Sequence, residues 1–288
     1  MKNKSIISAY IELTKPRILM LVIITTVLGF YLGGQGISSW SLLAFLVVGS
    51  SFVCGGSAAL NHYLEREFDS KMQRTKNRPI PSGTIAPSHA LSFGILLVLF
   101  GIFILYTEVN ILTAFLGLLT TFLYLMVYTP MKRVSWLNTT IGAVPGSIPP
   151  LGGWAAATGT LNFDAGILFL ILFIWQHPHF YAIAWMFRED YKRGGFKMLP
   201  VIEPDGQKTA KQVMFYSILL IPVSLAPVLT GMSGAIYFTG ALIAGSSLLL
   251  ISRLFAQSKS IISAKYLLRA TVLYLPILFL LIIMDKTF

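Results

Sequence analysis

Hydrophobic residues form long blocks along the chain, and short polar segments separate them. A helix needs roughly 20 mostly apolar residues to cross a bilayer core that is about 30 Å thick. Nine blocks meet this requirement and predict transmembrane helices near 17–34, 41–61, 90–107, 110–129, 136–157, 165–187, 213–230, 234–252 and 267–285. We therefore expect an all-α polytopic membrane protein, a bundle of nine transmembrane helices that residues 1–288 form as a single domain.

The fifth block differs from the others because prolines and glycines interrupt it. They are Pro145, Pro149, Pro150, Gly152 and Gly153. Irregular backbone at membrane depth is tolerated only where it is buried in protein or lines a cavity. We therefore expect this helix to face the interior of the bundle.

The first block follows basic residues, as the apolar core of a signal peptide does: Lys2, Lys4, Lys15 and Arg17. This block is long, however, and no small-residue cleavage site of the A-x-A type accompanies it. We interpret it as a membrane helix.

The composition excludes a soluble protein of this size. Hydrophobic residues make up 55% of the chain and charged residues only 11%, against roughly 25% charged residues in a typical soluble domain. The single cysteine, Cys54, excludes an internal disulfide and any zinc or iron–sulfur site built on cysteines.

The formal net charge of +11 follows the loops in a regular way. If the N-terminus is cytoplasmic, every Lys and Arg except Lys286 falls on the cytoplasmic side, in the N-terminal segment and in 62–89, 130–135, 188–212 and 253–269. Such a bias is typical of cytoplasmic loops. The basic residues therefore indicate topology rather than nucleic-acid binding, with the C-terminus outside.

The first polar constellation lies at the cytoplasmic end of the second helix. Asn61, Glu65 and Asp69 are spaced at i, i+4 and i+8, which keeps them on one stripe if the helix continues through them. Three hard oxygen ligands suit Mg²⁺, which binds a few carboxylates together with water and phosphate oxygens. This spacing predicts a metal site at the inner mouth of the helix.

Basic residues follow the acidic stripe at once. The guanidinium groups of Arg74 and Arg78 match phosphate oxygens in shape and charge, and Pro79 then ends any helix. The alternative is a solvated loop whose charges pair with one another and with lipid head groups. Ionisable residues at the edge of a spanning helix favour the functional interpretation, a site for metal and diphosphate.

The second polar constellation follows the sixth block. It contains His177, His179, the pair Glu189–Asp190, and basic residues that include Lys192. Asp190 is a candidate second metal ligand, and Lys192 a candidate contact for the far end of a diphosphate. The two histidines, at i and i+2, point to different sides of a helix. Three interpretations are open for each histidine: a haem ligand, a proton carrier or a hydrogen-bonded packing residue.

With these motifs the chain resembles the UbiA superfamily of intramembrane prenyltransferases. Asn61, Glu65, Asp69, Met72, Arg74, Thr75, Arg78 and Pro79 are similar to the signature N-x3-D-x3-D-x2-M-x-R-T-x2-R-P. Further matches are Tyr128-Thr129, Lys132-Arg133, Asn138, the stretch GAVPGSIPPLGGWAA, Pro178-His179-Phe180, Asp190-Tyr191 and Met198-Leu199-Pro200. Within the superfamily, the chain resembles the branch that farnesylates haem.

Two positions depart from the superfamily pattern. Glu65 stands where the family usually has Asp, so the carboxylate is kept on an arm longer by one methylene. Met186 lies four residues before Asp190, where the quinone-pathway relatives have a further carboxylate. This second departure fits the haem branch.

The resemblance implies a site that opens toward the cytoplasm, in the plasma (inner) membrane of a bacterium. The implied substrates are farnesyl diphosphate and haem b, the cofactor Mg²⁺ and the product haem o, with membrane lipid around the protein and a haem-modifying enzyme or terminal oxidase downstream. The implied metal and catalytic residues are Asn61, Glu65, Asp69 and Asp190. The implied diphosphate contacts are Arg74, Arg78, Lys132, Arg133 and Lys192, and the implied haem contacts are His177 and His179.

Three other functions are weighed against this one. A prenyltransferase for an aromatic acid such as 4-hydroxybenzoate would share the same signature. A transporter with a site at broken helices fits the fifth block but not the cytoplasmic carboxylate and arginine clusters. A structural subunit of an oxidase leaves both long charged loops unexplained.

Overall fold

A computed structural model describes residues 5–287, and the secondary structure in this range is helical apart from one isolated bridge between Ser233 and Lys286. The N-terminal half contains α1 (Ile6–Leu13), α2 (Pro16–Gly33), α3 (Trp40–Asp69), α4 (Pro87–Ile104), η1 (Leu105–Val109), α5 (Ile111–Phe122), η2 (Leu123–Tyr128) and α6 (Thr129–Met131). The C-terminal half contains α7 (Asn138–Ser147), α8 (Pro149–Thr158), α9 (Phe163–Met186), α10 (Arg188–Arg193), α11 (Leu199–Ile202), α12 (Gln207–Leu229), α13 (Ala235–Ser258) and α14 (Ile261–Met284). The expected all-α fold is confirmed.

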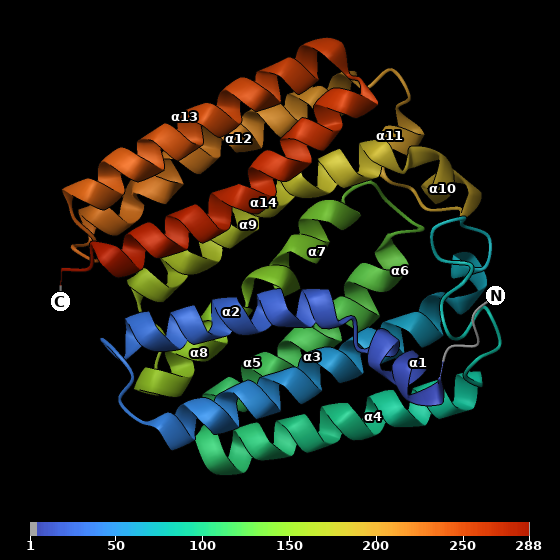
Figure 1. Cartoon of the computed structure of the whole chain (residues 1–288), viewed down its shortest axis with the longest axis horizontal. Coiled ribbons are helices and arrows are strands. Elements are labelled where there is room, and N and C mark those ends of the chain that lie inside the picture. Colours follow the sequence, from blue (N-terminus) through green and yellow to red (C-terminus); the bar gives the residue numbers. More distant parts are fainter. Residues whose placement is uncertain (1–4, 288) are drawn as a thin grey trace.

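Eight segments of the described chain are long and apolar enough to cross a membrane, so the expected count of nine continuous helices is wrong by one. The difference lies in the fifth block, which forms the two short helices α7 and α8. Pro149 and Pro150 cannot donate main-chain hydrogen bonds, and this interrupts the helix at Ile148. The α7–α8 pair still runs through the bundle, as Figure 1 shows.

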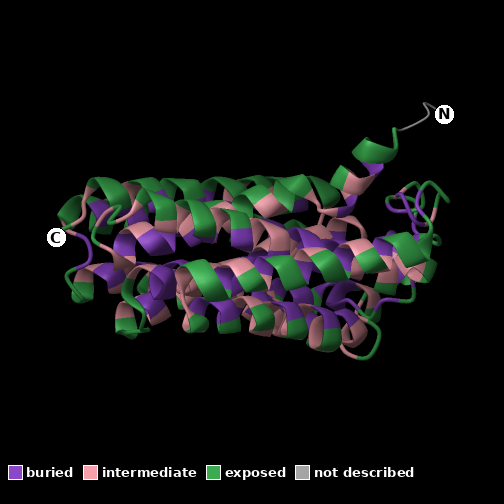
Figure 2. Cartoon of the chain, turned by 90° about the horizontal axis from the view of Figure 1, so that it is seen from below, coloured by how far each residue is buried: buried purple, intermediate pink, exposed green. Residues whose placement is uncertain are grey.

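The long helices lie roughly side by side, and α1 and the end of α14 lie at opposite ends of the bundle (Figure 1). Exposed residues cover the outside, and buried residues form its centre (Figure 2). Large apolar side chains such as Phe103, Leu229 and Met284 are exposed on this outer surface. Because an exposed apolar belt suits lipid rather than water, the arrangement is that of a multi-pass membrane protein.

The glycines of the fifth block bring α8 against α2. A Cβ on Gly153 would overlap the carbonyl oxygen of Thr26, and a Cβ on Gly29 would overlap that of Pro150. Small residues of this kind let two helix backbones approach closely in a membrane. Trp154, 6% exposed, belongs to the main apolar cluster, so this broken segment faces the interior as expected.

Helix α3 runs to Asp69, well beyond the end of the second hydrophobic block. This confirms the expectation that the helix continues through Asn61, Glu65 and Asp69. The three side chains lie at successive turns of the same helix and are all buried. The loop 70–86 then folds back over the end of α3, where Thr75 Oγ1 donates a hydrogen bond of 2.8 Å to the carbonyl oxygen of Asp69.

Candidate active site

The stripe on α3 meets a basic side chain at each of its polar positions. The Lys15 ammonium donates to Asn61 Oδ1 at 2.7 Å, and Asn61 Nδ2 donates to Thr129 Oγ1 at 3.1 Å. One turn further along, the Lys132 ammonium lies 2.8 Å from Glu65 Oε1. The contacts of Lys15 with Asn61 and of Lys132 with Glu65 join residues that are far apart in sequence, so they arise when the segments that carry the two lysines pack onto α3.

Asp69 is the last residue of α3 and is fully buried. Its Oδ2 accepts a 2.7 Å hydrogen bond from the guanidinium of Arg78, and its side chain is 1% exposed. Its other oxygen, Oδ1, is buried without a hydrogen-bond partner in the described structure. A buried carboxylate oxygen with no partner is costly unless a cation or water satisfies it, so this atom marks a point where a ligand is expected.

These groups surround a cavity of about 140 Å³ at the end of α3. Its lining residues are Lys15, Asn61, Glu65, Asp69, Met72, Arg74, Arg78, Tyr128, Lys132, Tyr191, Phe196 and Met198. Four of them are basic and two are carboxylates, so the cavity has an excess of positive charge. Such a cavity favours a strongly anionic ligand.

Lys15 is the basic residue of the cavity that was not predicted to belong to the site. In the sequence it appeared only as one of several basic residues ahead of the first hydrophobic block. The pKa of Lys15 is lowered to about 7; burial is the largest cause and repulsion from Arg78 the second. Its backbone has φ 51° and ψ 64°, in the left-handed region that a residue other than glycine rarely adopts. The sequence carries only a weak signal for this role, a lysine directly before Pro16 at the predicted cytoplasmic start of the first hydrophobic block.

Lys132, a predicted diphosphate contact, lines the cavity. Burial opposes its charge, but the carboxylate of Glu65 and the nearby tyrosines raise the pKa of Lys132 above its ordinary value. The ammonium also lies 4.5 Å from the ring centroid of Tyr128. Its backbone carbonyl accepts a 2.7 Å hydrogen bond from Lys197 N, and this links it to the loop that carries Phe196.

Asp190 does not enter the cavity. Its Oδ1 accepts a hydrogen bond from Gln73 N at 3.0 Å, and its Oδ2 accepts one from Arg74 N at 3.2 Å. Arg193 also pairs with Oδ1. Burial opposes ionisation, yet these donors hold the pKa of Asp190 below its usual range. The carboxylate therefore fixes the loop that places Arg74 in the cavity.

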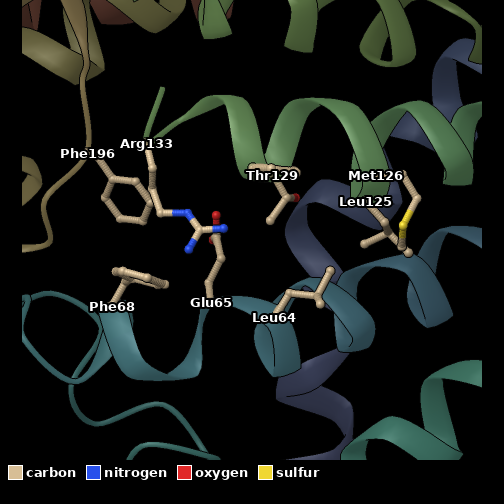
Figure 3. Close-up of a pocket in the computed structure, with 9 residues that line it drawn as sticks. Leu64, Glu65, Phe68, Leu125, Met126, Thr129, Arg133 and Phe196 are labelled. Carbon is tan, nitrogen blue, oxygen red and sulfur yellow. The ribbon is translucent and has the colours of Figure 1, made fainter. Parts of the chain in front are cut away.

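Arg133 and Lys192 also lie outside the cavity. Lys192 is exposed on α10. Arg133 lines a neighbouring groove of about 160 Å³, where its guanidinium is 4.7 Å from the ring centroid of Phe68. Figure 3 shows Leu64, Glu65 and Phe68 on one wall of this groove and Leu125, Met126 and Thr129 on the other. Glu65 and Phe196 line both spaces, so the groove adjoins the cavity.

The candidate residue Asn138 connects loops rather than lining the cavity. Its Nδ2 donates to the carbonyl oxygens of Ser135 and Lys197, at 2.6 and 3.1 Å. The loop after α6 and the loop after α10 are thereby held together above the end of α3.

The two histidines lie deeper in the bundle, on opposite sides of α9. His177 contacts Phe173 O through Nδ1 at 2.7 Å and Thr140 Oγ1 through Nε2 at 3.2 Å, so both nitrogens are engaged. His179 contacts Thr271 Oγ1 through Nδ1 at 3.0 Å, and within the described residues its Nε2 has no partner. His179 is also partly exposed. The expectation that they point apart is confirmed.

The donor set suits a hard divalent cation that also takes oxygens from its substrate. Within residues 5–287 no three His, Cys, Asp or Glu side chains gather as a metal cluster. The stripe instead offers one amide oxygen and two carboxylates, including the unpartnered Asp69 Oδ1. Mg²⁺ binds through one or two carboxylates and completes its shell with water and substrate phosphates, so the residues fit that ion.

Comparison with known proteins defines the class of this protein. Residues 22–280 match the UbiA prenyltransferase family, and the chain belongs to it. It is thus a multi-pass integral membrane prenyltransferase. The resemblance drawn from the α3 signature is confirmed.

Its curated relatives define the branch more narrowly. A protoheme IX farnesyltransferase from Solibacter usitatus is 46% identical over 96% of this chain and 98% of the relative. Proteins with the same description from Koribacter versatilis and Salinibacter ruber are 42% and 45% identical, and the alignments cover 98% and 96% of this chain and 94% and 98% of the relatives.

Solved structures share the fold at lower identity. A structure of digeranylgeranylglyceryl phosphate synthase matches with a TM-score of 0.82 and 18% identity, covering 98% of this chain and 99% of the other. A UbiA homolog from Archaeoglobus fulgidus, bound to DMAPP and Mg²⁺, matches with a TM-score of 0.71 and 14% identity, covering 96% and 99%.

Proposed function

We propose that this protein transfers the farnesyl group of farnesyl diphosphate to a vinyl group of haem b, which gives haem o and diphosphate. One observation carries the proposal: a cavity with four basic side chains, two carboxylates and an amide lies at the basic end of an apolar bundle. Such a site suits the anionic head of an amphiphile whose tail stays in the membrane. The protoheme IX farnesyltransferase relatives support the choice of acceptor.

Asn61, Glu65 and Asp69 would hold Mg²⁺, which when bound neutralises charge on the diphosphate. Lys15, Arg74, Arg78 and Lys132 would contact the diphosphate oxygens, because all four line the cavity. For Asp190 we propose a positioning role in place of direct metal binding, since both of its oxygens hold the loop that carries Arg74. Arg133 and Lys192 would attract the anion from outside the cavity.

In the reaction the bond between C1 of the farnesyl group and the diphosphate oxygen breaks, and its electron pair leaves with the diphosphate. The basic side chains stabilise that developing charge. The π electrons of the haem vinyl group then form the new bond to C1. Water captures the resulting cation next to the porphyrin ring and loses a proton, which leaves the hydroxyethylfarnesyl group of haem o.

For the acceptor, His179 is the stronger candidate of the two histidines. Its Nε2 is without a partner in the described structure, whereas both nitrogens of His177 are engaged. His179 would therefore orient haem through the iron or a propionate, and His177 would pack α9 against α7.

The orientation is also a proposal. The positive charges gather at the end of the bundle that holds the cavity, which favours a cytoplasmic site in the inner membrane of a bacterium, an N-terminus inside and a C-terminus outside. The opposite placement of α1 and the end of α14 agrees with this (Figure 1). Transfer of haem o to a later haem-modifying enzyme or oxidase would follow on the membrane.

The test is analysis of haems from cells that make haem b and farnesyl diphosphate and express this chain. We expect a farnesylated haem by chromatography and mass spectrometry, and its loss in Asp69→Ala with normal membrane insertion. A normal yield from Asp69→Ala would reject the metal site. If the wild-type chain makes no new haem, the same membranes should be assayed with 4-hydroxybenzoate, and prenylation of that acid would reject haem as acceptor.

A further inference from the structure

Two cations compete for the amide oxygen of Asn61. Lys15 donates to this oxygen at 2.7 Å, while Asn61 Nδ2 is directed at Thr129. The oxygen is the only atom of an amide side chain with lone pairs for a metal ion. An ammonium group and a divalent ion repel strongly at such short range. Lys15 must therefore leave Asn61 when a metal ion binds there.

The other two positions of the stripe repeat this arrangement. Glu65 holds Lys132 at 2.8 Å, and Asp69 holds Arg78 at 2.7 Å. Each proposed metal ligand thus carries one basic partner. A divalent ion that arrived alone would enter a cavity that already has excess positive charge, and the displaced Lys15 ammonium would keep only the neutral hydroxyl of Tyr124 as an acceptor. A diphosphate supplies anionic acceptor oxygens for all three basic groups.

We propose that Lys15 makes the binding of the divalent cation and of diphosphate mutually dependent, because it holds the metal-binding oxygen of Asn61 until a diphosphate accepts its ammonium group. The inference rests on the proposed function and adds the order in which the metal ion and the diphosphate bind. The metal and the diphosphate enter together, and the metal does not bind tightly first.

The geometry around Lys15 suits such an exchange. Helix α1 fixes the backbone, because Ala9 and Leu13 are fully buried and the ring of Tyr10 lies 4.9 Å from that of Phe93. The side chain is a flexible four-carbon arm. A second acceptor, Tyr124 OH, lies 3.3 Å from the same ammonium. The ammonium group can therefore change partners within the cavity while the main chain stays in place.

The experiment measures Mn²⁺ binding to the full chain in lipid nanodiscs by equilibrium dialysis, with and without inorganic diphosphate. For the wild type we expect diphosphate to tighten Mn²⁺ binding by about tenfold or more, and Mn²⁺ to tighten diphosphate binding by the same factor. Lys15→Met should bind Mn²⁺ alone more tightly than the wild type and show a smaller enhancement, while the part that depends on Arg78 and Lys132 remains. Dialysis against nanodiscs without protein corrects for Mn²⁺–diphosphate complexes in solution.

Lys76→Met is the matched control, because Lys76 is exposed on the same cytoplasmic loop as Arg74 and does not line the cavity. It removes one positive charge and should keep the enhancement, as should Lys15→Arg. If Lys15→Met does not accumulate, Lys15→Gln carries the same test. An enhancement that is absent in the wild type, or unchanged without the Lys15 charge, overturns the inference.

The binding measurement needs neither haem nor farnesyl transfer. If the enhancement fails while farnesylated haem is still made, only the inference about Lys15 falls. If the enhancement is present and no farnesylated haem forms, only the proposed acceptor falls.

Discussion

The carboxylate of Asp190 accepts a hydrogen bond from the main-chain N–H of Arg74 at 3.2 Å, across 116 positions of sequence. The bond fixes the backbone at Arg74, whose side chain lines the cavity. A residue that resembles a metal ligand in the sequence thus acts on the loop that covers the site.

For Asp190→Ala we expect the KM for farnesyl diphosphate to rise by roughly tenfold with a smaller change in kcat, because hydrogen bonds to a charged acceptor contribute about 1.5–3 kcal/mol. Steady-state assays in membranes would measure both constants. Arg193→Gln, which keeps the bonds from Gln73 and Arg74, is the matched variant and should have the smaller effect. An unchanged KM in Asp190→Ala would contradict the positioning role.

The same carboxylate should make the loop 70–86 sensitive to acid. Burial opposes ionisation, but Arg193 and two main-chain N–H groups lower the pKa of Asp190 in the folded protein. The contribution of this carboxylate to the stability of the folded loop is therefore complete above the ordinary aspartate pKa of about 3.9. It is lost as the pH falls through the lower pKa of the folded protein. Hydrogen exchange at Gln73 and Arg74, corrected for intrinsic rates, should rise on acidification in the wild type and be high at every pH in Asp190→Asn.

Glu65→Gln should reduce both stability and activity. It leaves the buried Lys132 ammonium without its carboxylate, and removal of one partner from a buried pair costs about 3–5 kcal/mol. Thermal unfolding in nanodiscs would report the loss. The double variant Glu65→Gln, Lys132→Met should regain stability because it removes the unpaired buried charge. It should not regain activity, because the carboxylate proposed to bind the metal is still missing.

Glu65→Asp tests the length of the side chain alone. It keeps a carboxylate and restores the residue usual in the family, so we expect most of the activity to remain. The haem assay of the proposed function measures this. Complete loss would show that the contact with Lys132 requires the longer arm of glutamate.

His179→Ala should weaken haem binding and leave farnesyl diphosphate binding unchanged, whereas His177→Ala should mainly lower the unfolding temperature. The reason is that His177 stacks on Tyr216, with ring centroids 3.6 Å apart, and contacts α7 through Thr140. Absorbance titrations with haem and thermal unfolding would separate the two effects. Equal haem affinities for His179→Ala and the wild type would remove His179 from the acceptor site.

Some features of this protein follow from residues close together in the sequence. The hydrophobic blocks predicted the spanning segments because burial of a helix in lipid depends on its own composition. The i, i+4 and i+8 spacing predicted one polar face on α3, since the pitch of a helix fixes which side chains share a face. The prolines predicted a break in the fifth segment, although they could not show that two short helices would result.

Contacts between distant segments were decided only by the tertiary structure. Lys15 reaches Asn61 across 46 positions, and Asp190 reaches Gln73 across 117. No local periodicity encodes such pairs, because they depend on how the loops and α1 pack against the end of α3. The sequence by itself therefore determined the membrane fold and the acidic stripe, whereas packing decided which basic side chains complete the cavity and which of the polar candidates stay outside it.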